Sequence, residues 1–71
     1  MKSFNYVNDL GYNKIINISD DKNENGEYSI SIWSGQTSQM ETTGMFCGSG
    51  SWTVEHLNEF LKHYGIDYQF S

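Results

Sequence analysis

Residues 53–65 constrain the fold most strongly, because they carry a complete set of helix signals. Apolar residues recur there every three or four positions, which places them on one side of a helix: Val54, Leu57, Phe60, Leu61 and Tyr64. Thr53 suits the amino-terminal cap, and Gly65 can adopt the left-handed conformation that ends a helix. The segment predicts one amphipathic helix whose apolar face must be buried.

Two segments upstream, residues 12–19 and 27–33, alternate apolar and polar residues with the period of two that is typical of β-strands. The apolar residues that share a face are Ile16 and Ile18 in the first segment and Tyr28, Ile30 and Ile32 in the second. Residues 20–26 between them, DDKNENG, contain no apolar residue and end in Asn-Gly. They predict the loop of an antiparallel hairpin.

The alternating segment at residues 3–7 predicts a short first strand, and residues 42–47 predict a third hairpin strand. Residues 34–41 predict a polar connection. Residues 67–71 predict either a short edge strand or a tail packed by two aromatic side chains. The expected fold is a single α+β domain over residues 1–71. It has a three- or four-stranded antiparallel meander with one amphipathic helix packed on one face.

The other face of this sheet is expected to lack cover. Trp33, Ile15 and Met45 would then form an apolar patch, and such patches often mark interfaces. Rigid aromatic anchors within a polar rim are what small interfaces use. Trp33 is therefore a candidate for contacting a partner.

The charge of the chain narrows the class of partner. Nine acidic residues face four basic ones, all lysine, for a net charge of −5. Phosphate contacts and guanine readout depend on clustered Arg and Lys, so nucleic acid is not expected as a direct ligand. A protein partner with a basic surface is the natural expectation, and it would meet Glu55, Asn58 and Glu59 on the helix and Asp20, Asp21 and Glu24 in the hairpin loop.

The single cysteine, Cys47, rules out an internal disulfide, which for so small a chain favours a reducing, cytoplasmic compartment. No secretory signal is recognisable at the amino terminus, and no apolar run approaches the ~20 residues that span a bilayer. We therefore expect no membrane association.

Residues 21–26 match the first half of a calcium-binding loop, D-x-N-x-N-G. The match fails at the twelfth position, which is Ile32 rather than a bidentate Glu, and strands rather than helices flank it. An acidic, solvated hairpin loop is the favoured interpretation.

His56 and His63 are seven residues apart on the helix, about 10 Å along its axis, which is too far to share one metal ion. We expect no metal and no cofactor.

Residues 48–51, GSGS, precede the helix and predict a flexible entry loop, with anion binding as the sharper alternative. Cys47 has no identifiable base or orienting partner in the sequence, so a partly buried strand cysteine is favoured over a nucleophile. Glu55 and Glu59 are like charges one turn apart on an open helix face and lack any means of separating their pKa values. An enzyme is therefore not expected.

The opening strand MKSFNYVN, the hairpin around DDKNENG and the helix TVEHLNEFLKHYG together resemble the small single-domain inhibitors that bacteriophages and mobile elements encode against host defence, including some anti-CRISPR proteins. The resemblance is one of architecture and transfers no functional residue. It implies a stoichiometric, acidic, protein-binding antagonist of a nucleic-acid-handling complex in the host cytoplasm. Two alternatives remain open: a small-ligand or anion-binding protein that uses residues 48–53 with Cys47 and His56, and a self-associating protein that forms a homodimer.

Overall fold

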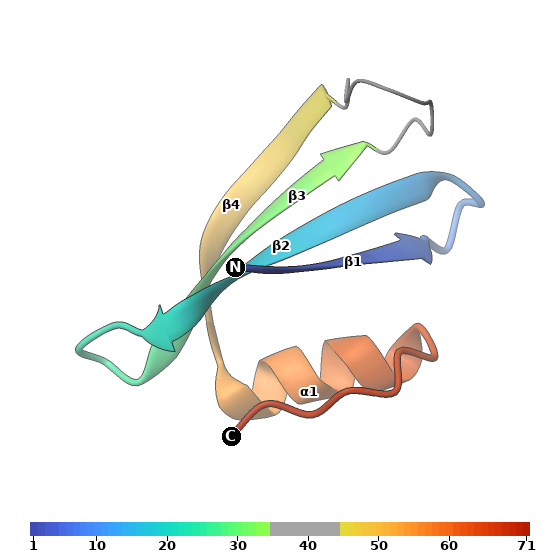
Figure 1. Ribbon diagram of the computed structural model, residues 1–71. Helices are drawn as coiled ribbons and strands as arrows, with labels where there is room; N and C mark the ends of the chain where they lie inside the picture. Colours follow the sequence, from blue (N-terminus) through green and yellow to red (C-terminus); the bar gives the residue numbers. More distant parts are fainter. Residues whose placement is uncertain (35–44) are drawn as a thin grey trace.

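The computed structural model describes residues 1–34 and 45–71, which form a four-stranded antiparallel sheet with one helix on one face (Figure 1). The strands lie in the order β1-β2-β3-β4, so the sheet is a meander with β1 and β4 at its edges. The elements are β1 Lys2–Val7, β2 Asn13–Lys22, β3 Glu27–Ser34, β4 Met45–Thr53 and α1 Val54–His63. The predicted α+β class is confirmed. Within the described residues, no helix is long and apolar enough to cross a membrane.

The core lies between the sheet and α1. Four side chains are fully buried, Ile16 and Ile18 from β2 and Leu57 and Leu61 from α1. The strand period of two and the helical period predict that these side chains face inward. Tyr28, Ile30 and Phe70 complete the core. A core of this size is small, as expected for a chain that buries a modest fraction of its surface.

Both ends of α1 follow the predicted signals. The Thr53 hydroxyl accepts a hydrogen bond from the amide of His56 at 3.1 Å, which caps the amino-terminal end. At the other end, the amide of Ile66 donates to the Leu61 carbonyl at 2.9 Å and that of Gly65 donates to the Lys62 carbonyl at 3.1 Å. Gly65 has φ +74°, so the helix ends in a Schellman motif.

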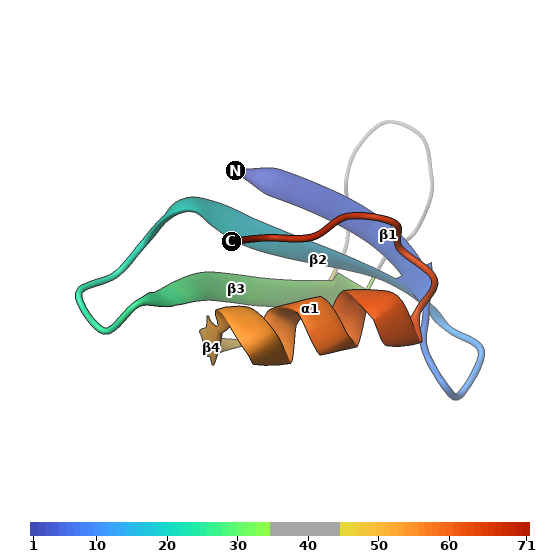
Figure 2. The ribbon, with the colours of Figure 1, turned by 90° about the horizontal axis from the view of Figure 1, so that it is seen from below.

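The carboxyl-terminal segment is a tail rather than an edge strand. Residues 66–71 run alongside α1 and share with it the cover of the inner sheet face (Figure 2). Tyr68 packs against Phe4 of β1 with ring centroids 5.5 Å apart, and Phe70 packs against Tyr28 of β3 at 5.0 Å. Of the two predicted outcomes, the aromatic-packed tail is the observed one.

The prediction of a glycine-rich entry loop at residues 48–51 is wrong. These residues belong to β4, which pairs with β3 so that Ile32 lies opposite Gly48 and Ile30 opposite Gly50, and which runs directly into α1. Backbone pairing with a neighbouring strand outweighs the low strand propensity of Gly and Ser. Of the strand predicted at residues 42–47, residues 42–44 lie outside the described residues and the rest belongs to β4. Of the connection predicted at residues 34–41, residues 35–41 lie outside the described residues and Ser34 belongs to β3.

The predicted loop at residues 20–26 is too long. Asp20, Asp21 and Lys22 are part of β2, and the turn begins at Asn23. The Asn23 side-chain oxygen accepts hydrogen bonds from the amides of Asn25 at 2.8 Å and Glu27 at 3.0 Å. Gly26 has φ +79°, the left-handed conformation that closes a three-residue hairpin loop.

The turn between β1 and β2 is built in the same way. The Asn8 side-chain oxygen accepts from the amides of Leu10 at 3.0 Å and Tyr12 at 2.9 Å, and Gly11 has φ +88°. The shared sequence is N-x-x-G, a short repeat in NDLG and NENG. An Asn that organises the loop and a Gly that closes it thus set the register of both hairpins.

Candidate protein-binding surface

The sheet face opposite α1 carries an aromatic pair. The strand registers place Asn5, Ile15, Trp33 and Phe46 in one row across all four strands. The Trp33 and Phe46 rings meet edge to face, with centroids 5.2 Å apart and planes at 69°. Phe46 is 52% exposed and Trp33 is half-buried. Part of the predicted apolar patch is thus observed, with Phe46 as its most exposed described side chain.

Phe46 was missed by the sequence analysis because a bulge changes the face of β4. The register shifts by one residue after Ile32, so that Ile32 pairs with Gly48 but Trp33 pairs with Phe46. Cys47 is the extra residue of the bulge. The sequence of residues 42–47 does not reveal the position of this shift, which depends on the neighbouring strand. Met45, the third predicted member of the patch, begins β4, and its side chain lies outside the described part of the structure.

A second row of small polar side chains lies beside the aromatic row. Ser3, Asn17, Ser31 and Ser49 are cross-strand neighbours in the four strands. The Ser3 hydroxyl donates to the Asn17 side-chain oxygen at 2.6 Å, and the Trp33 indole N–H donates to the Ser31 hydroxyl at 3.2 Å. The bond to Ser31 favours one orientation of the indole, and both rows are uncharged.

Five acidic residues belong to elements at the opposite end of the sheet. Glu27 of β3 is paired with Thr53, which places the start of β3 beside the amino-terminal end of α1. These residues are Asp20, Asp21, Glu24, Glu27 and Glu55, and we call this group the acidic end. Trp33 is six residues along β3 from Glu27, about 20 Å at the usual strand rise. The predicted hairpin and aromatic residues therefore do not form one site.

Asp20 makes an ion pair at this end. Its carboxylate accepts a hydrogen bond from the Met1 ammonium group at 2.6 Å. This hydrogen bond, and then the charge of the ammonium group, hold the pKa of Asp20 below its ordinary value; nearby Lys2 lowers it further. The other acidic residues of the predicted loop, Asp21 and Glu24, are exposed.

Glu55 and Glu59 are exposed on α1, as predicted, but on the side of the sheet away from Trp33. Asn58, which was predicted to share their surface, is half-buried and holds the tail in place. Its amide nitrogen donates to the Phe70 carbonyl at 3.0 Å, and its oxygen accepts from the Phe70 amide at 2.8 Å. The structure thus gives Asn58 a structural role that helical periodicity alone could not reveal.

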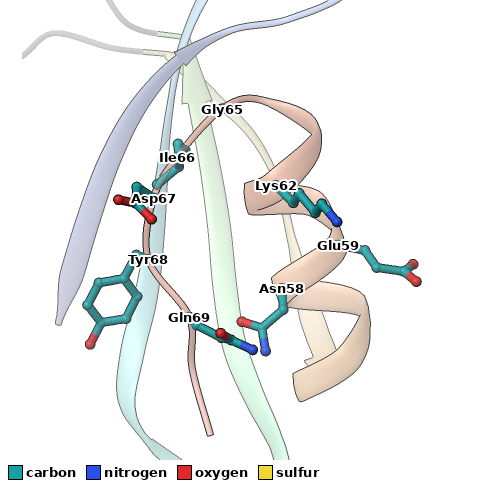
Figure 3. A pocket seen from close by; sticks show the side chains of 8 residues that line it. All are labelled: Asn58, Glu59, Lys62, Gly65, Ile66, Asp67, Tyr68 and Gln69. Carbon is teal, nitrogen blue, oxygen red and sulfur yellow. The ribbon is translucent and has the colours of Figure 1, made fainter.

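A groove of about 660 Å³ runs between α1 and the tail (Figure 3). Its lining mixes apolar surface with amide, acidic and basic groups: Asn58, Glu59, Lys62, Gly65, Ile66, Asp67, Tyr68 and Gln69. The Glu59 and Lys62 side chains extend from α1 away from the tail (Figure 3). The groove gathers opposite charges on the molecular surface and brings no nucleophile next to a base.

The features proposed for small-ligand binding are spread apart. Cys47 and Trp52 are five residues apart along β4, about 17 Å, and His56 packs on Trp52 at a ring distance of 4.6 Å. Cys47 instead lies 3.5 Å from the Lys14 ammonium group. Near it, Tyr6 has its pKa raised, chiefly by burial and secondarily by Tyr64 and Cys47.

The calcium-like motif is used by the turn. Asn23, the third position of the motif, directs its side-chain oxygen at two backbone amides rather than toward an open site. Within residues 1–34 and 45–71, no group of three His, Cys, Asp or Glu side chains is arranged to hold a metal ion.

Comparisons with protein families, curated proteins and solved structures found no match to the chain.

Proposed function

We propose that this protein is a small, acidic, non-enzymatic binding module that inhibits a host protein complex by occupying its surface. The observation that carries the proposal is the Trp33–Phe46 pair on the outer sheet face. A partly exposed aromatic pair costs solvation free energy in the free protein, and a partner that buries the rest of it recovers about 25 cal/mol per Å². The row of Ser and Asn side chains beside it supplies hydrogen-bonding groups for a polar rim.

The acidic end supports a basic partner. It carries Asp20, Asp21, Glu24, Glu27 and Glu55 against Lys2, Lys22 and the Met1 ammonium group, in a chain of net charge −5. Charges located away from the anchor chiefly raise the association rate and are screened by salt. The aromatic pair would supply the affinity, and the acidic end would speed the encounter. A nucleic-acid-handling host complex, of the kind targeted by phage-encoded anti-defence proteins, has such a basic surface.

The test is a titration of bacterial RNA-guided nucleases and other purified defence complexes with the protein, read out as residual activity. A stoichiometric inhibitor gives a linear loss of activity that ends at a fixed ratio of protein to complex. The double variant Trp33→Ala/Phe46→Ala should abolish inhibition, whereas Tyr12→Ala, which removes another exposed ring, should leave it intact. Inhibition by the double variant at the wild-type level would contradict the assigned surface.

A separate charge variant tests whether the acidic residues of α1 speed the association with the partner. Glu55→Lys/Glu59→Lys reverses two exposed charges on α1 without touching the aromatic pair. We expect it to slow association and reduce its salt dependence while dissociation changes little. Equal association rates for this variant and the wild type would remove the helix acids from the proposal.

A further inference from the structure

β4 is an edge strand in the part of the sheet that the structure describes, and its sequence lacks the residues that usually protect an edge. Natural edge strands are blunted by charges, prolines or short length, because their backbone N–H and C=O groups can pair with another strand. β4 spans nine residues, MFCGSGSWT, without a charge or a proline. Among residues 1–34 and 45–71 its only strand partner is β3, since β4 ends the sheet. The bulge at Cys47 interrupts only its beginning, which leaves Gly48–Thr53 as a regular edge.

We propose that β4 pairs with β4 of a second copy of this chain, antiparallel and about a two-fold axis near Gly50. An antiparallel strand pair can be symmetric, so one edge can serve both copies. With the axis at Gly50, Ser49 lies opposite Ser51 of the other copy, and Trp52 lies opposite Gly48. Each large side chain then meets a small one, which makes the edge complementary to itself.

The glycines fit this arrangement. Gly48 and Gly50 lie within β4, where glycine destabilises a strand relative to alanine. Neither has a positive φ, and a Cβ added at either one would meet no atom within 4 Å. Contacts within the described part of the chain therefore do not explain why glycine occurs at these positions. In the proposed dimer the backbone of the second copy comes close to both glycines and its Trp52 side chain lies opposite Gly48, which would explain them.

The distribution of charge favours the antiparallel orientation. The end of β4 at Thr53 is in register with Glu27, beside the acidic end, whereas its beginning at Met45 is in register with Ser34 and then Lys14. His63, in the last turn of α1, lies 3.4 Å from Asp9 in the turn between β1 and β2, so that end carries both signs of charge. An antiparallel pair keeps the two acidic ends apart, whereas a parallel pair would set them together.

The dimer would have one continuous sheet of eight strands. Opposite residues of an antiparallel pair share a face, so both α1 helices would lie on one side and both Trp33–Phe46 pairs on the other. If the proposed function holds, this arrangement makes the protein bivalent toward a symmetric or repetitive partner. Dimer formation itself does not depend on that function.

Sedimentation velocity of the full chain over a range of concentrations tests the proposal. The wild type should sediment as a concentration-dependent dimer. Ser49→Lys/Ser51→Lys sets Lys opposite Lys twice and should sediment as a monomer, although it lowers the net negative charge. Ser49→Lys/Ser51→Glu sets opposite charges face to face at an unchanged net charge and should restore the dimer. Trp33→Ala/Phe46→Ala should dimerise like the wild type.

A wild type that stays monomeric at every attainable concentration overturns the proposal, as does a Ser49→Lys/Ser51→Lys variant that dimerises normally. Amide hydrogen exchange of the wild type gives a result that needs no variant. Exchange in Gly48–Thr53 should slow as the protein concentration rises, while exchange in β1, the other edge, should not. Exchange in β4 that is independent of concentration also overturns the proposal.

Discussion

Asn58 and Phe70 are joined by two hydrogen bonds, one in each direction between the Asn58 side-chain amide and the Phe70 backbone. The amide thereby acts as a short substitute for a strand partner. It satisfies both backbone polar groups of a residue that is only 8% exposed. The tail can therefore supply a core residue without forming a strand.

Replacing Asn58 should release the tail. Asn58→Ala leaves the Phe70 amide and carbonyl without protein partners, and we expect it to lower the free energy of unfolding by about 1–3 kcal/mol. The measurement is urea unfolding followed by fluorescence. Asn58→Asp keeps the acceptor but loses the donor and should be intermediate. Glu59→Ala, at the exposed neighbouring residue, serves as the control. If Glu59→Ala lost as much stability as Asn58→Ala, the role assigned to Asn58 would be contradicted.

The two Asn-organised turns should respond alike. Asn23→Ala and Asn8→Ala each remove a side-chain oxygen that accepts two backbone amides, and each should cost about 1 kcal/mol of stability. Asn25→Ala changes the same loop at a residue whose side chain organises no such pair of bonds. In thermal unfolding, Asn25→Ala should have a clearly higher melting temperature than Asn23→Ala and Asn8→Ala. Equal melting temperatures for Asn23→Ala and Asn25→Ala would refute the turn mechanism.

Asp20 should titrate below an ordinary aspartate. Its pKa is lowered in the folded state, so the stability it contributes is present above the ordinary aspartate pKa and is lost as the pH falls through the lowered value. NMR titration of the Asp20 carboxyl carbon measures the folded-state pKa directly. Acetylation of the Met1 amine should bring that pKa back toward the ordinary range. An unchanged pKa after acetylation would assign the shift to another group.

The Trp33 and Phe46 rings should be energetically coupled. A double-mutant cycle of Trp33→Ala and Phe46→Ala should give an interaction free energy of about 0.5–1.5 kcal/mol in unfolding experiments. A matched cycle of Trp33→Ala and Tyr12→Ala pairs two rings without a ring contact and should give a value near zero. Equal coupling in both cycles would mean that the edge-to-face contact contributes nothing.

Local patterns in the sequence determined much of this fold. The helical period and the signals at Thr53 and Gly65 specified α1 and both of its ends, because capping and periodicity involve neighbouring residues only. The alternation around Ile16 and Ile30 specified which faces of β2 and β3 are buried. These predictions rest on interactions within a few residues and needed no knowledge of the sheet.

Contacts between distant residues decided the rest. GSGS at residues 48–51 resembles a loop and becomes strand only because β3 offers it a ladder of hydrogen bonds. Phe46 reaches the outer face through a bulge defined by the partner strand, and Asn58 turns to the tail because the fold brings Phe70 beside it. The predicted acidic site residues are exposed, and Trp33 is half-buried on the outer sheet face. The tertiary structure alone places them at opposite ends and on opposite sides of the sheet.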